Sequence, residues 1–335
     1  MSKDNIYVGI DLHKLNFTFV MLGEDGQELS CGRRTTEAGE IADFASCLDY
    51  RHHVVMEPLE NCYWVMGFMR PYAGSICLAN SYKVRLIAES RLKNDRIDAR
   101  ILADLLRVGY LPKAYIPDDQ LIGWRCLVSH HIQLVRDRTR LKNRILSLIN
   151  REGHRLSVKD AFGKRGREEI DSLPLCSNLR RMVDTNLTQV DLLTSQLKTL
   201  DKEIEEIGKS DRIIELLRSI DGIGYFSALA IRAAVGDMKR FKNARSFAAY
   251  TGLIPSYRAS AEVTYHGHIT KRGVPYLRWV LVESVNHAIR HCDYLKRLYQ
   301  RICFRSSVGK ARVAVAHALA RIIFHVWTEA RPYHR

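Results

Sequence analysis

No hydrophobic run in the sequence approaches the roughly 18 residues that a membrane-spanning helix requires. The first residues, MSKDNIYVGIDLHK, also lack the layout of a signal peptide, because an aspartate interrupts their apolar stretch. The eight cysteines are scattered and include no CxxC pair, which argues against a zinc ribbon and against a disulfide framework. Repeats and low-complexity tracts are missing as well. We therefore expect a cytoplasmic protein that makes no membrane contact.

The 335 residues are 46% hydrophobic and 27% charged, which is typical of a globular protein with room for two domains. The net charge of +15 is unevenly distributed. Residues 1–117 hold 14 basic and 15 acidic residues, whereas the remainder holds 38 basic and 22 acidic ones. This division favours a first part that holds cations and a second part that binds a phosphate backbone. A basic surface that only confers solubility is the alternative.

In the first part, strand and helix patterns alternate. We expect strands at 6–10, 17–22, 28–35, 53–56 and 75–79, and helices that begin at Thr36, span 63–70 and span 95–108. The resulting order, βββαβαβα, is that of an RNase H-like domain, in which helices flank a mixed sheet.

The second part is predicted to be mostly helical. One long helix over 119–153 carries a basic run that either faces solvent or contacts phosphates. A connecting loop is expected over 157–174. A second long helix over 178–207 has apolar residues at alternating steps of three and four, which predicts coiled-coil pairing within or between chains. The basic run consists of Arg136, Arg138, Arg140, Lys142 and Arg144.

Further along the chain, Asp221-Gly222-Ile223-Gly224 resembles the turn of a helix-hairpin-helix. There Gly222 and Gly224 would let backbone N–H groups approach a phosphate, although a structural helical hairpin gives the same pattern. Helices are expected over 244–250 and 276–291, flanking a loop rich in glycine, serine and threonine. A closing helix is expected over 309–327.

Four carboxylates in the first part are candidate metal ligands. Asp11 and Glu57 end two predicted strands, and Asp95 and Asp98 share one helix face because they are three residues apart. Neighbouring carboxylates repel unless a cation lies between them, and such oxygen ligands suit Mg²⁺ or Mn²⁺. Two such ions can clamp an in-line phosphoryl transfer. Asp95 could instead cap its helix, and Glu60 is a rival to Glu57.

Ser260 lies in the polar loop over 252–273. A serine hydroxyl is a weak nucleophile that needs a base, a metal or a cationic environment. No Ser-His-Asp order is evident, and the residues alone favour an ordinary loop serine.

Several blocks of the sequence resemble those of one transposase family. They are YVGIDLHK, VVMEPLENCYW and KNDRIDARILADLL in the first part, and SIDGIG, ARSFAAYTGLIPSYRAS and ITKRGVPYLRWVL in the second. The family is the DEDD insertion-sequence family, often called the IS-one-ten family, which includes the pilin-gene inverting recombinase and the bridge-RNA-guided recombinases. The resemblance covers about residues 5–107 and 210–332, with the blocks in order.

The resemblance implies a RuvC-like RNase H-fold domain with the long basic helix (1–154), a linker and coiled-coil helix (155–210), and a mostly helical transposase domain with a catalytic serine (211–335). It places the acidic motif on Asp11, Glu57, Asp95 and Asp98, and the nucleophile on Ser260, with Ser256 a nearby rival. Lys271 and Arg272 join the nucleic-acid-binding candidates. The implied partners are donor and target double-stranded DNA, a structured guide RNA, and further copies in a homodimer or homotetramer.

The main alternative is a RuvC-like Holliday-junction resolvase, which would use the four carboxylates without a serine. The long basic segment over 211–335 is more than a resolvase requires. An actin-like ATPase would need glycine and threonine after its first strand, where this chain has Leu12-His13-Lys14. A non-catalytic nucleic-acid-binding protein would need a decayed metal site.

Overall fold

The computed structural model describes residues 4–87, 94–260 and 263–334, except for the side chains of residues 257–260 and 263–266. The chain forms two compact units, residues 1–116 and 117–335, and each is described by itself. No helix in the described ranges is both long and apolar enough to cross a membrane.

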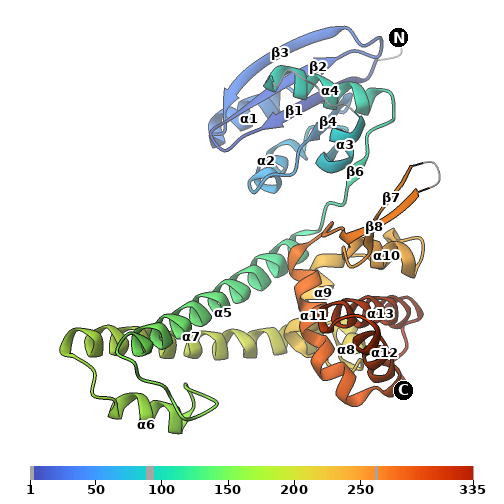
Figure 1. Cartoon of the computed structure of the whole chain (residues 1–335). Coiled ribbons are helices and arrows are strands. Elements are labelled where there is room, and N and C mark those ends of the chain that lie inside the picture. Colours follow the sequence, from blue (N-terminus) through green and yellow to red (C-terminus); the bar gives the residue numbers. More distant parts are fainter. Residues whose placement is uncertain (1–3, 88–93, 261–262, 335) are drawn as a thin grey trace. The chain divides into compact units, whose positions relative to one another are not determined.

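The first unit is built on a six-stranded mixed sheet with the order β3-β2-β1-β4-β5-β6 (Figure 1). β1, β2 and β3 form an antiparallel meander, and β4 and β5 continue the sheet parallel to β1. The short β6 pairs antiparallel with β5 at the edge. The strands are β1 (Ile6–Leu12), β2 (Asn16–Leu22), β3 (Glu28–Thr35), β4 (His52–Met56), β5 (Ser75–Ala79) and β6 (Lys113–Ala114).

Helices cover both faces of this sheet. α1 (Ala38–Ser46) and α2 (Cys62–Met69) pack on one face over a cluster that includes Val8, Ile10 and Val54. α4 (Asp95–Arg107) covers the other face, where Ala99 and Ala103 pack with Val20 and Leu22. The order of elements reproduces the predicted βββαβαβα pattern, with α3 (Ser81–Ile87) and β6 as additions.

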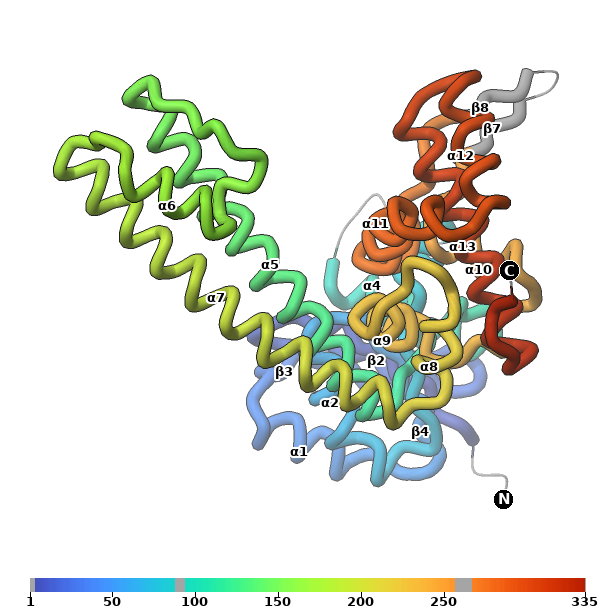
Figure 2. The backbone as a smooth tube through the Cα atoms, turned by 90° about the horizontal axis from the view of Figure 1, so that it is seen from below, coloured from blue at the N-terminus to red at the C-terminus, as the bar shows by residue number. Residues whose placement is uncertain are grey.

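The second unit begins with two long helices, α5 (Asp119–Arg151) and α7 (Ser177–Ser210), which lie side by side (Figures 1 and 2). Ile145 and Ile149 of α5 pack against Val183 and Leu187 of α7. The apolar seam expected on the second helix is therefore buried within the chain. Because α5 packs on α7 and α9, the units divide at residue 116, ahead of the boundary at 154 drawn from the sequence.

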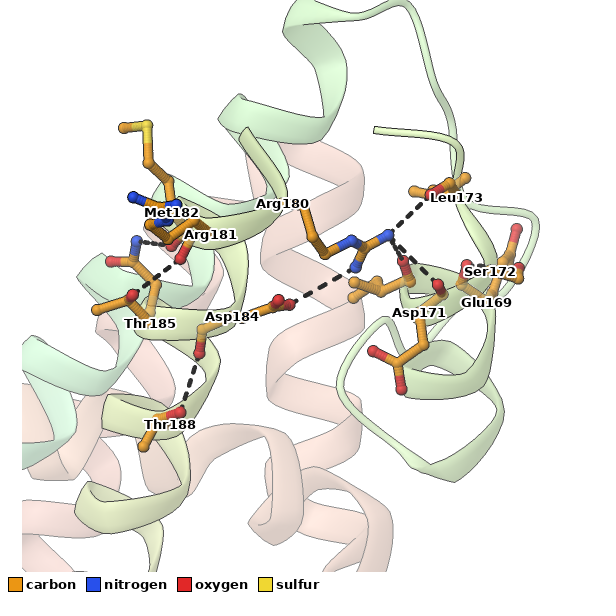
Figure 3. A network of polar contacts seen from close by, with 12 residues as sticks. Glu169, Asp171, Ser172, Leu173, Arg180, Arg181, Met182, Asp184, Thr185 and Thr188 are labelled. Atoms are coloured by element: carbon orange, nitrogen blue, oxygen red, sulfur yellow. Dashed lines mark hydrogen bonds and ion pairs between the residues drawn. The ribbon is translucent and has the colours of Figure 1, made fainter. Parts of the chain in front are cut away.

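The expectation of a simple connecting loop over 157–174 was wrong, because this segment contains α6 (Lys164–Ser172). Arg180 of α7 donates to the carbonyl oxygens of Ile170, Asp171 and Leu173, at 3.1, 3.3 and 2.7 Å (Figure 3). The last carbonyls of a helix have no partner within it, so this guanidinium caps the end of α6 and ties it to α7.

The remaining elements form a helical assembly with one hairpin. The predicted polar loop over 252–273 is largely an antiparallel hairpin, and α12 was not foreseen because Leu295 is its one buried hydrophobic residue among those described. The predicted mixture of a sheet domain and many helices is confirmed. These elements are α8 (Arg212–Arg218), α9 (Tyr225–Val235), the 3₁₀ turn η1 (Met238–Arg240), α10 (Ala244–Tyr250), β7 (Pro255–Ser260), β8 (Val263–Ile269), α11 (Pro275–His291), α12 (Asp293–Arg305) and α13 (Val308–Glu329).

Candidate metal centre

The side chain of Asp11 points to the face of the sheet that α4 covers, because side chains alternate along a strand. Successive residues of a strand point to opposite faces, and Val8, Ile10 and Leu12 belong to the cluster under α1 and α2. Gly9 and Asp11 therefore point toward α4. The Asp11 side chain keeps 14% of its surface exposed, so it is largely withdrawn from water.

Gly9 allows α4 to lie directly on β1. A Cβ atom at this position would lie 1.9 Å from the carbonyl oxygen of Ala99 and 2.7 Å from the amide nitrogen of Ala103. Only a residue without a side chain permits such a close approach of helix and strand. This contact brings the first turn of α4 to the end of β1 that carries Asp11.

Asn94 caps α4 and leaves both aspartates of the first turn available. Its side-chain oxygen accepts a hydrogen bond from the Arg96 backbone N–H at 3.0 Å, as in an N-cap. The alternative that Asp95 serves as the cap is thereby removed. Asp95 and Asp98 lie in the first helical turn, where the helix dipole favours negative charge.

Asp11, Asp95 and His13 form a compact cluster. The His13 Nε2 atom lies 3.2 Å from Asp11 Oδ2 and 3.7 Å from Asp95 Oδ1. One ligand atom from each residue lies within 4.8 Å of the others. The imidazole thus sits between two carboxylates.

The pKa of the Asp11 carboxyl is perturbed by its surroundings. The pKa of this carboxyl is raised from the usual 3.8 to about 6, and burial is the largest cause. The neighbouring charges of Asp95 and Asp98 raise it too, while the charge and hydrogen bond of His13 lower it. Desolvation and like charges both disfavour an ionised carboxylate. A bound cation would reverse this penalty.

The cluster fits a divalent ion. Two oxygens bound to one Mg²⁺ at about 2.1 Å each lie no more than about 4.2 Å apart, and the ligand atoms of this cluster lie within 4.8 Å of one another. Carboxylate oxygens are the donors that Mg²⁺ and Mn²⁺ prefer. The exposed side chains of His13 (48%) and Asp95 (43%) leave one flank open to solvent and substrate.

Asp98 lies near Asp11, and the strand register directs Glu57 toward the same end of the sheet. Ile10 pairs with Met56, so Glu57 follows its strand beside Asp11. Val55 packs on the α4 side, and the same alternation continued for two residues carries Glu57 to that side. The electrostatic influence of Asp98 on Asp11 shows that it lies close by. The exposed Glu60 lies three residues beyond Glu57.

His13 is the member of the cluster that the sequence analysis did not assign. Its signal was the alternation Gly9-x-Asp11-x-His13, which predicts that all three residues share one face if the strand direction persists. The imidazole nitrogen lies within 4 Å of an oxygen of each carboxylate.

Comparison with known proteins identifies the family. A DEDD transposase model of the IS110 type matches residues 8–152, and the model "Transposase IS116/IS110/IS902 family" matches residues 214–300. The chain belongs to the IS110 family of DEDD transposases. Members of this family are insertion-sequence transposases, enzymes that cleave and transfer DNA strands.

Relatives from several bacteria align with this transposase over nearly its full length. A probable family 20 transposase of Pseudomonas aeruginosa is 26% identical over 95% of both chains. The transposase for insertion sequence element IS1111A of Coxiella burnetii is 25% identical over 99% of this chain and 92% of its own. The transposase for element IS1328 of Yersinia enterocolitica is 25% identical over 96% of both.

Ser260 is the last residue of β7, and its backbone pairs with Val263 at the hairpin end. Its side chain lies outside the described part of this transposase. Ser256, its rival, lies near the foot of the hairpin, where its hydroxyl faces Gly267 of β8.

The basic run of α5 divides into two groups. Arg136, Arg140 and Arg144 are exposed and recur every four residues, so they form one stripe, in which Arg140 pairs with Asp137 at 3.2 Å. Lys142 is half-buried, and its ammonium lies 4.8 Å from the centre of the Phe162 ring. Burial lowers the Lys142 pKa. Arg138 is also half-buried, so the stripe is the part that is open to a phosphate backbone.

The two glycines of the α8–α9 turn have different roles. Gly222 has a φ of 88°, and a Cβ there would lie 2.7 Å from the Ser284 carbonyl oxygen of α11. This glycine is therefore required by packing. Gly224 is exposed at the start of α9, and a Cβ there would meet no atom within 4 Å. Of the two, Gly224 is the more exposed and is the stronger candidate for a phosphate contact.

Lys271 and Arg272 are exposed between β8 and α11. Lys271 adopts a φ of 52°, and its N–H donates to the Gly252 carbonyl oxygen at 3.3 Å. The Arg272 carbonyl oxygen lies 2.4 Å from the position of a Cβ at Gly252. These backbone contacts close the foot of the hairpin and fix where the two basic side chains begin.

Proposed function

We propose that the chain is a DNA recombinase that cleaves and rejoins strands through a metal-dependent carboxylate site and a covalent serine intermediate. The observation that carries the proposal is the convergence of Asp11, Asp95 and Asp98 on the α4 face of a mixed sheet in a chain of this family. The strand order and directions of the first unit support an RNase H-like, RuvC-like domain.

Asp11, Glu57, Asp95 and Asp98 are the proposed ligands of Mg²⁺, with Mn²⁺ as a substitute. When bound, the divalent ions neutralise charge on the phosphate oxygens and stabilise the attacking and leaving oxygens. Asp11 and Asp95 hold the ligand oxygens from two different elements, β1 and α4. His13, released from the carboxylates, would then be free to orient a water or the DNA.

Ser260 is the proposed nucleophile. Its Oγ would attack the phosphorus, form a serine–phosphate ester, and break the bond to the 3′ oxygen, which leaves with a proton as a 3′-hydroxyl. A second 3′-hydroxyl would then attack the same phosphorus and return the proton to the serine. The bond energy is retained through both steps, whereas hydrolysis by water would lose it. A resolvase needs no such serine, and the transposase match over residues 214–300 favours the recombinase.

Donor and target DNA are the proposed substrates, and a structured guide RNA would select the sequence. The proposed contacts go to the phosphate backbone of the nucleic acid and come from Arg136, Arg144 and Gly224. These residues provide no ordered set of side chains that could read the bases. The proposed working form is a homodimer or homotetramer, in which composite sites would join Ser260 to the carboxylates. If RNA-free protein selected its target with full specificity, the guide-RNA part of the proposal would be wrong.

Trapping the covalent intermediate tests the serine. Wild-type protein incubated with element-end DNA, guide RNA and Mg²⁺ should give a denaturation-resistant adduct, and peptide mass mapping should place it on Ser260. Ser260→Ala should bind DNA yet give no adduct. Ser256→Ala, in the same strand, is the matched control and should keep adduct formation. An adduct on Ser256, or none with the wild type, contradicts the assignment.

A further inference from the structure

After Asp293, the first residue of α12, the rest of this helix and the start of α13 carry positive charge only. Residues 294–312 contain six basic and no acidic residues. We call this segment the α12–α13 corner; the two helices lie side by side in Figures 1 and 2. Its basic residues are Lys296, Arg297, Arg301, Arg305, Lys310 and Arg312.

The charge of this corner is not neutralised by the protein. All six basic side chains are exposed, and within the described ranges none of them makes an ion pair. Some exposed basic residues elsewhere in the second unit do find partners, as Lys209 does with Glu205 at 2.7 Å. Unpaired cations on one surface indicate a polyanionic ligand.

Phe304 stands in the middle of these charges with 94% of its surface exposed. It lies one helical turn after Arg301 and beside Arg305, so all three occupy neighbouring positions on α12. A single exposed hydrophobic residue needs no explanation. A fully exposed aromatic ring between arginines, however, is the arrangement on which an unpaired base stacks while the cations hold its phosphates.

We propose that the α12–α13 corner binds an unpaired segment of nucleic acid, with Phe304 stacked on a base and the arginines on the flanking phosphates. A duplex hides the faces of its bases, so it would use the arginines and leave Phe304 without a role. A membrane surface would need an apolar helix face, but Leu295, on the apolar side of α12, is buried within the unit. Pairing of this corner with the same corner of a second copy would place six positive charges of each copy against each other.

The corner adjoins a groove of about 1120 Å³. Tyr294, Leu298 and Lys310 line one side, while Pro255 and His268 at the foot of the β7–β8 hairpin line another. A strand held at the corner can follow this groove to the hairpin that carries Ser260. This second step rests on the proposed function, whereas binding at the corner does not and needs no metal.

Fluorescence anisotropy with the full-length chain in EDTA tests the proposal. The probes are a labelled 20-nucleotide single strand of mixed sequence and the duplex of the same sequence. Phe304→Ala should weaken single-strand binding about tenfold and leave duplex binding unchanged. Phe304→Trp should restore single-strand binding, and Phe304→Leu should not, because it keeps the apolar character without a ring to stack.

Arg301→Gln with Arg305→Gln should reduce the dependence of log affinity on log salt by about 1.4, or about 0.7 for each charge on a single strand. The matched control is Lys198→Gln with Lys202→Gln, an exposed pair of the same spacing on α7 without ion pairs in the described ranges; it should keep the preference for single strands. Equal affinity of wild type and Phe304→Ala for the single strand overturns the proposal. So does a change of oligomeric state in Phe304→Ala, which would make the corner a protein interface.

Discussion

Replacing Asp11 by asparagine should stabilise the metal-free protein while abolishing its activity. The folded protein raises the pKa of this carboxyl from 3.8 to about 6, through burial first and through Asp95 and Asp98 next. Each pKa unit corresponds to about 1.4 kcal/mol, so ionised Asp11 costs up to about 3 kcal/mol of folding free energy at neutral pH. Asparagine has nearly the same shape and carries no charge.

The pH dependence gives this prediction its sign. Between pH 4 and 6 the folded protein retains a proton on Asp11 that the unfolded chain releases, so the stability of the wild type falls as pH rises through this window. The advantage of Asp11→Asn should thus be near zero at pH 3.5 and reach its full value at pH 7. Urea denaturation measures it, and hydrogen exchange assigns the transition to the first unit.

A control variant and the addition of Mg²⁺ test whether the stability change comes from the Asp11 charge. Asp43→Asn, which changes an exposed carboxylate on α1, should alter the stability by no more than a few tenths of a kcal/mol. Saturating Mg²⁺ should stabilise the wild type, because a ligand that binds only the folded state adds its binding free energy, but it should leave Asp11→Asn unaffected. An asparagine variant less stable than the wild type at pH 7 would refute the reasoning.

Two further predictions concern glycines. Gly9→Ala should destabilise the first unit by about 1–3 kcal/mol, because its Cβ would lie 1.9 Å from the Ala99 carbonyl oxygen. Gly67→Ala on α2, where a Cβ meets open space, is the control and should be neutral or stabilising. Denaturation of both variants measures the difference. Gly222→Ala should destabilise the second unit, because of its φ of 88° and its contact with α11, while Gly224→Ala should leave the melting temperature unchanged; equal effects would contradict the separate roles.

The core of the first unit could be predicted from the sequence because its strands and α4 are strongly patterned. The run Ile6–Ile10 predicted Asp11 at the end of its strand, and the structure adds one further strand residue, Leu12. The period of α4 correctly predicted Asp95 and Asp98 in the first turn of the helix. Their proximity depends on Gly9, whose close contact with Ala99 is a property of the packed fold. His13 followed the same alternation, yet a single histidine after a strand carries no signal until its carboxylate neighbours are known.

The elements that the sequence did not predict are held by contacts from distant residues. α6 has Gly166 and Ile170 as its buried residues and is fixed by the Arg180 guanidinium. The polar strands β7 and β8 pair with each other outside any larger sheet, so their composition resembles that of a loop. α12 exposes most of its surface because its charges face outward, and a helix with so narrow a buried face shows little periodicity.

Metal-dependent strand cleavage tests the central claim most directly. Wild type, Asp11→Asn and Ser260→Ala would each be incubated with element-end DNA and guide RNA, in Mg²⁺ and in EDTA, and the products resolved under denaturing conditions. The wild type should yield a serine-linked strand and exchanged product in Mg²⁺ only, and both variants should bind DNA without cleaving it. Normal cleavage by Asp11→Asn, or cleavage by the wild type in EDTA, would show that the carboxylate cluster is not the metal centre.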